Sequence, residues 1–285
     1  MIQMSPGVKH MLISTFFFAL MNALVKYLHH IPFYELILFR SLVAGSMAAF
    51  EIKRQGLSLL GVNKKYLFLR GLTGSFALLS FFYTLQTMPL ASAVTVQYLS
   101  PIFTSFLAIF LLKERMRAIQ WLFLLVAFGG VLMVKGFDTR VSFFELSMGI
   151  CSALMAGFAY NFIRKLRTTD NPYVVVFYFP LIAIPVVAPL CVWEWVQPEG
   201  WDWLWLLLMG IFTQLGQINL TKSYQSAEVG TVSSLLYTGV IYALMIGWLW
   251  FEESFQWENF LGMAIIILGV LLNLWYVELN KKRQR

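Results

Sequence analysis

Charged residues are scarce in this sequence. Only 12% of its 285 residues are Asp, Glu, Lys or Arg, and 59% are apolar. Soluble domains carry about 25% charged and about 45–50% apolar residues. A water-soluble fold of this composition would expose large apolar patches, which aggregate. The shortage of charge therefore excludes an ordinary soluble protein and predicts an integral membrane protein.

Acidic residues are also missing from the middle of the apolar segments. Glu35, Glu145 and Glu194 all fall near the ends of such segments. A proton-coupled exporter of cations generally needs a carboxylate buried in the membrane, where either ion can bind. This absence argues against an exporter of cationic drugs and favours a neutral, zwitterionic or anionic solute.

The signatures of catalysis and of metal binding are absent as well. The sequence contains no HExxH, GxSxG or Walker motif. Its two cysteines, Cys151 and Cys191, lie in separate apolar segments, where a thiol usually serves packing. We therefore expect no enzyme activity, no metal and no cofactor.

Long apolar runs dominate what is present. A membrane-spanning helix needs about 20 apolar residues. The runs fall at about 8–28, 33–50, 66–86, 90–112, 118–135, 143–163, 173–196, 203–222, 229–251 and 257–277. The sequence thus predicts an all-α membrane protein of ten transmembrane helices joined by short loops.

Lys and Arg are distributed unevenly between alternate loops. The side facing the cytoplasm is expected to carry the excess. One side has only Lys26, Lys135 and Arg140. The other has 17, namely Lys9, Lys53, Arg54, Lys64, Lys65, Arg70, Lys113, Arg115, Arg117, Arg164, Lys165, Arg167, Lys222, Lys281, Lys282, Arg283 and Arg285. This asymmetry predicts a multi-pass membrane protein with both termini in the cytoplasm.

The same distribution bears on the binding partners. Basic residues spread along one membrane face do not form a nucleic-acid site, so we expect none. The expected partners are a small-molecule substrate and membrane lipid, with the chain a monomer or a homodimer.

The sequence contains an internal repeat. A shift of 139 residues lays 83–134 over 222–273 without a gap and aligns Tyr98 with Tyr237 and Glu114 with Glu253. In each copy the glutamate closes one apolar segment and precedes another of equal length. The repeat predicts two modules of five helices each.

Five is an odd number, so the second module should cross the membrane in the opposite sense to the first. We place the modules at 1–140 and 141–285. Duplicated halves of inverted topology are typical of secondary transporters, in which movement of one half against the other exposes a midplane site alternately to each side.

Several stretches resemble a known transporter repeat. They are Arg40, Arg70-Gly71-Leu72, Leu90-Ala91-Ser92-Ala93, Tyr98-Leu99-Ser100-Pro101, Leu112-Lys113-Glu114 and Gly130-Val131-Leu132 in the first copy, and Tyr237, Phe251-Glu252-Glu253 and Gly269-Val270-Leu271 in the second. The chain is identified by them as similar to the EamA-type members of the drug/metabolite transporter superfamily. The resemblance implies a ten-helix inner-membrane carrier whose central cavity is lined mainly by helices 1, 3, 4, 6, 8 and 9.

One position departs from that pattern. Val240 stands where the first copy has Pro101. Proline removes a backbone donor and bends a helix. We therefore expect the fourth predicted helix to be more strongly bent than the ninth.

Arg40 is the clearest candidate for binding the solute, because it lies about seven residues into the second predicted helix. A guanidinium at that depth is costly and usually faces a cavity or a partner. One interpretation is that it binds a carboxylate or phosphate of the solute. The alternatives are a structural ion pair with Glu35 and a side chain that reaches out to the headgroups.

The other candidates are uncharged polar or aromatic side chains within predicted spans. They are Asn22, Tyr83, Gln97, Tyr98, Ser100, Tyr160, Gln214, Gln217 and Tyr237. Amides and hydroxyls in a span either bind the solute or join helices. Aromatic side chains there serve packing or stack on a planar solute.

The sequence thus favours a secondary transporter, an exporter or an exchanger, that works by alternating access on a small metabolite such as an amino acid. The alternatives are an intramembrane enzyme and a membrane sensor without transport activity.

Overall fold

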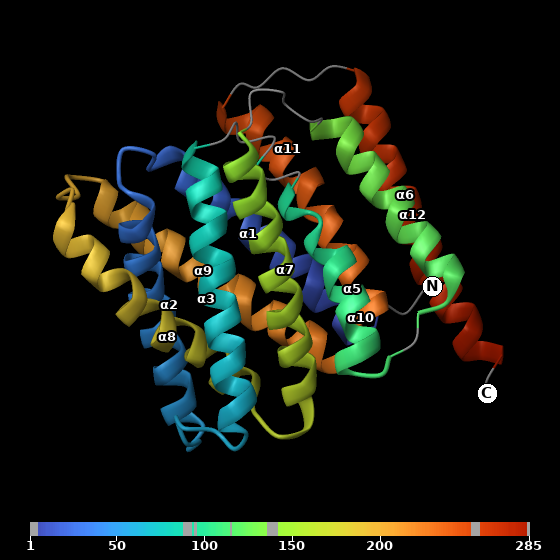
Figure 1. Cartoon of the computed structure of the whole chain (residues 1–285), viewed down its shortest axis with the longest axis horizontal. Coiled ribbons are helices and arrows are strands. Elements are labelled where there is room, and N and C mark those ends of the chain that lie inside the picture. The colour runs from blue at the N-terminus through green and yellow to red at the C-terminus, as the bar shows by residue number, and fades with distance from the viewer. Residues whose placement is uncertain are drawn as a thin grey trace.

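The computed structural model describes residues 5–87, 93, 96–114, 116–135, 142–251 and 257–283. All regular structure in these ranges is helical (Figure 1). The α-helices are α1 (Pro6–Tyr27), α2 (Phe33–Arg54), α3 (Lys64–Thr87), α5 (Ser100–Leu111), α6 (Ala118–Lys135), α7 (Phe143–Lys165), α8 (Pro172–Trp193), α9 (Asp202–Ser226), α10 (Val229–Val232), α11 (Thr238–Phe251) and α12 (Trp257–Arg283). Two 3₁₀ helices, η1 (Leu166–Thr168) and η2 (Ser233–Tyr237), complete them.

Six of these helices are long and apolar enough to cross a membrane. They are α1, α2, α3, α7 with its 3₁₀ extension, α8 and α9. The shortest has 22 residues, about 33 Å at 1.5 Å per residue, which matches a hydrocarbon core of about 30 Å. The predicted multi-pass, all-helical membrane protein is confirmed at this level.

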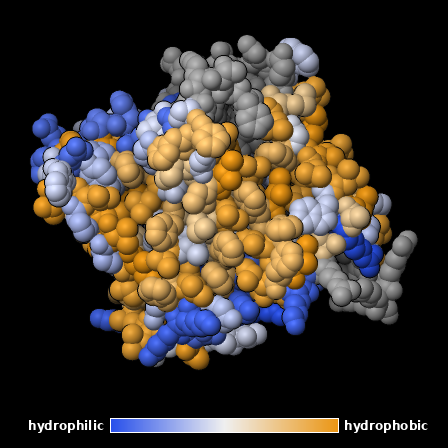
Figure 2. Space-filling model, viewed as in Figure 1, coloured by the Kyte–Doolittle hydropathy of each residue, from blue (hydrophilic) through white to orange (hydrophobic). Residues whose placement is uncertain are grey.

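The surface agrees with a lipid environment. Figure 2 shows a broad apolar band across the middle of the visible face, with hydrophilic side chains gathered along the lower edge and at the upper left. Large apolar side chains such as Phe110, Leu125 and Leu268 are exposed. In water such a surface would aggregate, whereas in a bilayer it faces the acyl chains.

Local sequence signals explain where several helices begin. Ser142 and Glu145 form a reciprocal capping box at the start of α7. The side chain of Asn171 accepts the backbone N–H of Tyr173 at the start of α8, where Pro172 stands at a position whose N–H would be unsatisfied anyway. These caps determine where α7 and α8 begin, and both helices contribute many buried residues to the core.

Most of the long helices pack in pairs that join the first half of the chain to the second. Helix α1 packs on α9, and α3 packs on α7, while α2 packs on α8 and α6 on α12. Gly130 and Gly269 lie at the α6–α12 contact, where a side chain on either glycine would meet the backbone of the other helix. The glycines of the repeated Gly-Val-Leu motif thus permit these two helices to approach closely.

Both repeat copies interrupt the helix that carries the aligned tyrosine. In the first copy, Tyr98 and Leu99 form a turn before α5, which has Pro101 in its first turn. In the second copy, α10, η2 and α11 replace one continuous α-helix. Part of the fourth predicted helix, residues 90–92 and 94–95, lies outside the described residues, so the expectation that it is more strongly bent than the ninth stays a prediction.

Side-chain hydrogen bonds give the physical reason for the second interruption. Asn273 Nδ2 donates to the Gly230 carbonyl at 3.0 Å, and the Thr238 hydroxyl donates to the Leu235 carbonyl at 2.7 Å. Because these carbonyls accept hydrogen bonds from side chains, they do not depend on the backbone N–H four residues later. The chain can therefore form a 3₁₀ turn here without proline.

Candidate solute-binding cavity

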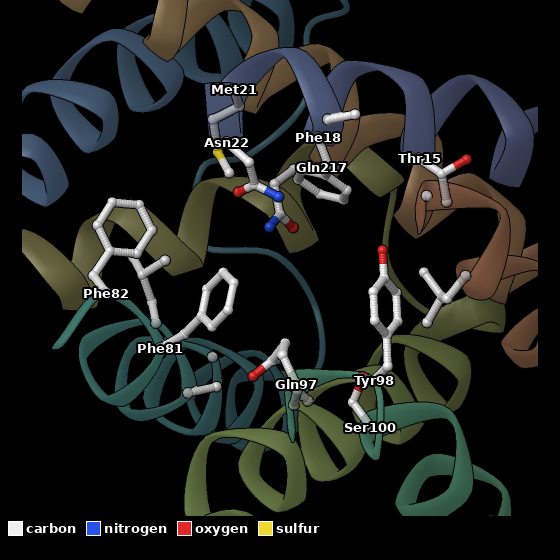
Figure 3. A pocket seen from close by; sticks show the side chains of 18 of the residues that line it. Thr15, Phe18, Met21, Asn22, Phe81, Phe82, Gln97, Tyr98, Ser100 and Gln217 are labelled. Carbon is white, nitrogen blue, oxygen red and sulfur yellow. The ribbon is translucent and has the colours of Figure 1, made fainter. Parts of the chain in front are cut away.

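A cavity of about 220 Å³ lies between the two copies of the repeat. Helices α1 and α3 and the residues just before α5 supply one part of its lining, and α7, α9 and η2 supply another. Figure 3 shows Asn22 and Gln217 projecting into the space from one wall and Phe81, Gln97 and Tyr98 from the opposite wall. A cavity of this size suits a small metabolite rather than a macromolecule.

Seven of the ten predicted site residues line this cavity. They are Asn22, Arg40, Gln97, Tyr98, Ser100, Tyr160 and Gln217. The structure thus brings together residues from segments that are up to about 200 positions apart in the sequence.

The other three predicted residues are not among those that line the cavity. Tyr83 packs its ring against Phe33 and Phe144. Gln214 is buried one helical turn before Gln217. Tyr237 is completely buried with its ring 5.9 Å from that of Tyr98, its counterpart in the repeat. It therefore supports a lining residue from behind.

Arg40 lies in the cavity wall, and no carboxylate of the described residues forms an ion pair with it. Its side chain is not near the surface, since the residue is only 2% exposed. The predicted alternative of an ion pair with Glu35 is not what the structure contains, because Glu35 accepts the backbone N–H of Val196 at 2.8 Å instead. Arg40 Nη1 instead lies 3.8 Å from Met21 Sδ.

Aromatic rings surround the Arg40 guanidinium. Its central carbon lies 5.6 Å from the centre of the Phe82 ring and 5.4 Å from that of Phe179. A cation over an aromatic face gains about 2 kcal/mol when desolvated. The cost of burying an ion is several kcal/mol, so the rings alone do not compensate it.

Arg70 is a functional candidate that the sequence analysis missed. We counted it with the cytoplasmic loop residues, but it is 2% exposed and lines the cavity. The reason is that α3 begins at Lys64, which places Arg70 nearly two turns inside the helix. Its Nη2 donates to Gln217 Oε1 at 3.0 Å, and its guanidinium carbon lies 5.0 Å from the centre of the Phe179 ring.

A glycine makes room for this arginine. Gly74 is one helical turn from Arg70, and a methyl group at that position would collide with Arg70 Nη1 and press on the Phe179 ring. The spacing of arginine and glycine within an apolar run is the sequence signal that would have identified Arg70 as an inward-facing residue.

The cavity is positively charged. Among the lining residues that the structure describes, Lys26, Arg40 and Arg70 are cationic and none is acidic. No carboxylate in the described ranges forms an ion pair with either arginine. Both guanidiniums stay charged, because arginine does not lose its proton in proteins.

Neutral polar groups complete the lining. Asn22 Oδ1 is buried and has no hydrogen-bond partner among the described residues. Gln97 Oε1 lies 2.8 Å from the hydroxyl of Ser152, which also contacts the Ala77 carbonyl at 2.6 Å. Such groups orient a ligand, since each buried donor or acceptor requires a partner.

A second arginine cluster lies near the C-terminal ends of α5, α7 and α9. Arg164 Nε donates to Glu114 Oε1 at 2.8 Å, and Arg164 Nη1 donates to the Gln225 carbonyl at 3.2 Å. Glu114 Oε2 accepts the backbone N–H of Val229 at 3.0 Å. One ion pair thus joins the first repeat to three segments of the second.

The described residues hold no group of three His, Cys, Asp or Glu side chains that is arranged to bind a metal. Cys191 is buried as expected, but Cys151 is exposed on the apolar surface rather than part of the core. Both thiols are free.

Comparison with known proteins identifies the family. The model of the EamA-like transporter family matches the chain twice, over residues 5–136 and 143–275. The pseudopaline exporter of Pseudomonas aeruginosa is 30% identical over 271 residues, which cover 94% of this chain and 95% of the exporter. Solute carrier family 35 member G1 of Mus musculus is 26% identical, with coverage of 94% and 79%.

Two further matches extend the comparison. The riboflavin transporter of Vibrio cholerae is 26% identical over 206 residues, which cover 70% of this chain and 67% of that protein. A solved crystal structure superposes with a TM-score of 0.81 at 18% identity and covers 95% of this chain and 97% of its own. At that identity the structural match concerns the fold.

Proposed function

The chain belongs to the EamA-like transporter family, and from this premise we propose that it is a secondary carrier that exports or exchanges a small metabolite by alternating access. Its relatives are transporters and not enzymes, so it is a multi-pass membrane transporter. The proposal adds the mechanism, the topology and the class of solute.

The proposed architecture has ten transmembrane helices in two modules, 1–140 and 141–285. The double match of the family model supports this division. The packing supports it as well, because exchanging the modules turns the α1–α9 contact into the α7–α3 contact and leaves α2–α8 and α6–α12 unchanged. Contacts that are reciprocal in this way are typical of a two-fold relation.

Two modules of five helices that are related by a two-fold axis in the membrane plane have inverted topology. With ten helices and short connections, both termini lie on one side, and the excess of Lys and Arg assigns that side to the cytoplasm of the inner membrane.

One observation carries the mechanism: polar side chains of both modules line one buried cavity. Asn22 and Gln97 come from the first module, and Tyr160 and Gln217 come from the second. A site at the interface of two modules is exposed to opposite sides when one module moves against the other. The Glu114–Arg164 ion pair joins the two modules outside this lining.

The proposed solutes are neutral, zwitterionic or anionic. The described lining lacks a carboxylate that would bind a cation and has two arginines that repel one. The relatives include a pseudopaline exporter and a riboflavin transporter. The match with the exporter over nearly its whole length favours export for this chain.

Counterflow in proteoliposomes tests the proposal. Vesicles that contain the purified protein are preloaded with one unlabelled solute of a metabolite panel and diluted into the same solute in labelled form. A carrier accumulates the label transiently, because labelled solute enters while unlabelled solute leaves. The absence of counterflow for every amino acid, organic acid, vitamin and nucleoside tested, with protein shown to be folded, would refute it.

Cysteine labelling tests the inverted topology independently. In a variant without Cys151 and Cys191, single cysteines replace Met116, which follows α5, and Gln256, which stands in the sequence between α11 and α12. A membrane-impermeant maleimide should label Gln256→Cys in intact cells and Met116→Cys only after lysis. Labelling of both from the same side would exclude inverted modules.

A further inference from the structure

Two buried guanidinium groups share one aromatic ring in the wall of the cavity. The guanidinium carbons of Arg40 and Arg70 lie 5.4 and 5.0 Å from the centre of the Phe179 ring. The two carbons are therefore within about 11 Å of each other, a separation that one small ligand can span.

Both arginines have hydrogen-bond donors that the chain does not use. A guanidinium has five N–H donors. Among the described residues, neither the Nε of Arg40 nor the Nε of Arg70, both buried, has a hydrogen-bond partner. The polar contacts that the structure gives their Nη atoms are one distant sulfur for Arg40 and one amide oxygen, that of Gln217, for Arg70.

Buried donors in proteins nearly always have an acceptor. Aromatic rings lie within 5.6 Å of both guanidinium carbons, and a ring offers no hydrogen-bond acceptor equal to a carboxylate, so N–H groups of both arginines remain for binding. The edge of a guanidinium has the fork geometry that fits a carboxylate through two parallel hydrogen bonds. The described residues do not supply the missing acceptors for Arg40 and Arg70, so we look for them in a ligand.

The two arginines that form no ion pair with a described carboxylate define the ligand. A single carboxylate would neutralise one arginine and leave the other buried without a counter-charge. We propose, on the basis of the transport function proposed above, that the solute is a small organic acid with two separate carboxylates, one bound by Arg40 and the other by Arg70, with an apolar middle against the phenylalanine rings.

Gly74 and Gln217 serve this site as positioning residues. Gly74 leaves the space that the Arg70 guanidinium occupies, and Gln217 holds one of its Nη atoms, which orients the free edge. Arg40 has only a sulfur contact of this kind and is held chiefly by the Phe82 and Phe179 rings.

A series of matched compounds tests the inference by thermal stabilisation of the purified full-length protein in detergent. The probes are the linear dicarboxylates from succinate to suberate, each with its monoamide and its diamide, which have nearly the same shape. Methyl phosphate serves as the probe for a single dianionic group. A ligand that binds the folded state raises the unfolding temperature, and its concentration dependence gives the affinity.

We expect at least one diacid to bind about tenfold or more tightly than its own monoamide, since each charged hydrogen-bonded group contributes about a factor of ten or more. In Arg40→Met and in Arg70→Met this preference should fall to within about threefold, because only one fork remains. Arg54→Met, which removes an exposed arginine of α2, should keep the wild-type preference.

Arg40→Lys and Arg70→Lys are controls for the possibility that the methionine variants fail to fold. They keep the charge without the fork, so they should retain part of the preference for the diacid. Equal binding of diacid and monoamide throughout the series, stabilisation by methyl phosphate alone, or an unchanged preference in the methionine variants would each overturn the inference.

The two proposals fail in different ways. If a diacid binds as expected but shows no counterflow, the site is correct and the carrier mechanism is wrong. If neutral solutes show counterflow while no diacid is preferred, the protein is a carrier and the two-carboxylate site is wrong.

Discussion

Arg164 and Arg40 are both nearly buried arginines within a membrane-spanning segment, yet their surroundings are opposite. Arg164 has a carboxylate at 2.8 Å and backbone carbonyls of α9 as acceptors. Arg40 has two aromatic rings and one sulfur atom. Arg164 thus serves to join helices, whereas the Arg40 guanidinium has N–H groups left to bind a ligand.

The largest expected effect on stability comes from removing the ion-pair partner of Arg164. Glu114→Ala removes the partner of Arg164 and leaves its charge largely buried, so the free energy of unfolding should fall by about 3 kcal/mol. Thermal unfolding in detergent, followed by tryptophan fluorescence, measures the loss. The double variant Glu114→Ala with Arg164→Met should recover most of it. A single variant as stable as the wild type would show that the cluster is not structural.

Gly74→Ala should have the next largest effect, because it overfills the space around Arg70. Overpacking of this kind costs about 1–3 kcal/mol of stability. Solute counterflow should fall together with stability, since the displaced guanidinium cannot keep its position. Gly129→Ala is the matched control, because a methyl group there meets nothing within 4 Å. Equal effects of the two substitutions would contradict the proposed role of Gly74.

Arg40→Met should change stability in the opposite direction to Glu114→Ala. Replacing an uncompensated buried charge by an apolar side chain of similar length should stabilise the fold by about 1 kcal/mol or more. Transport should be lost in the same variant. The combination of a raised unfolding temperature with lost counterflow distinguishes a binding residue from a structural one, and a lowered unfolding temperature would argue for the latter.

The smallest expected effect compares two glutamines of α9 that are three residues apart. Gln217 lines the cavity and bonds to Arg70, whereas Gln214 is buried outside it. Gln217→Leu should slow counterflow several-fold, while Gln214→Leu should leave it unchanged. Both should change stability by only about 0.6 kcal/mol, the usual scale for a polar contact between membrane helices. Equal transport by the two variants would remove Gln217 from the site.

The sequence predicted the long helices well, for a physical reason. A bilayer fixes the length of a span and requires its backbone to be satisfied internally, so apolar runs correspond closely to helices. The predicted run 33–50 lies within α2, and the run 118–135 coincides with α6. The interruption at η2 was not foreseen, because it depends on Asn273, which lies about 40 residues away in the sequence.

The site was predicted in part. Polar residues in the middle of spans, such as Asn22 and Gln217, were identified because their burial in lipid would be costly. Arg70 was not, since its depth depends on where α3 begins, and counting loop charges assumes that arginines near a span end lie in water. The partner of Glu35 was also missed, because it is the backbone of Val196, which sequence patterns do not reveal.

The reciprocal packing of α1 on α9 and of α3 on α7 has a consequence for how the protein is made. During synthesis, α1 enters the membrane well before Asp202–Ser226, the segment it packs against, has been translated. Helices in a bilayer first insert and then associate. The first half of the polypeptide therefore lies in the lipid with its future interface uncovered. The α3–α7 and α2–α8 contacts can form when the middle third has been made, whereas the α1–α9 and α6–α12 contacts form only after the last third arrives.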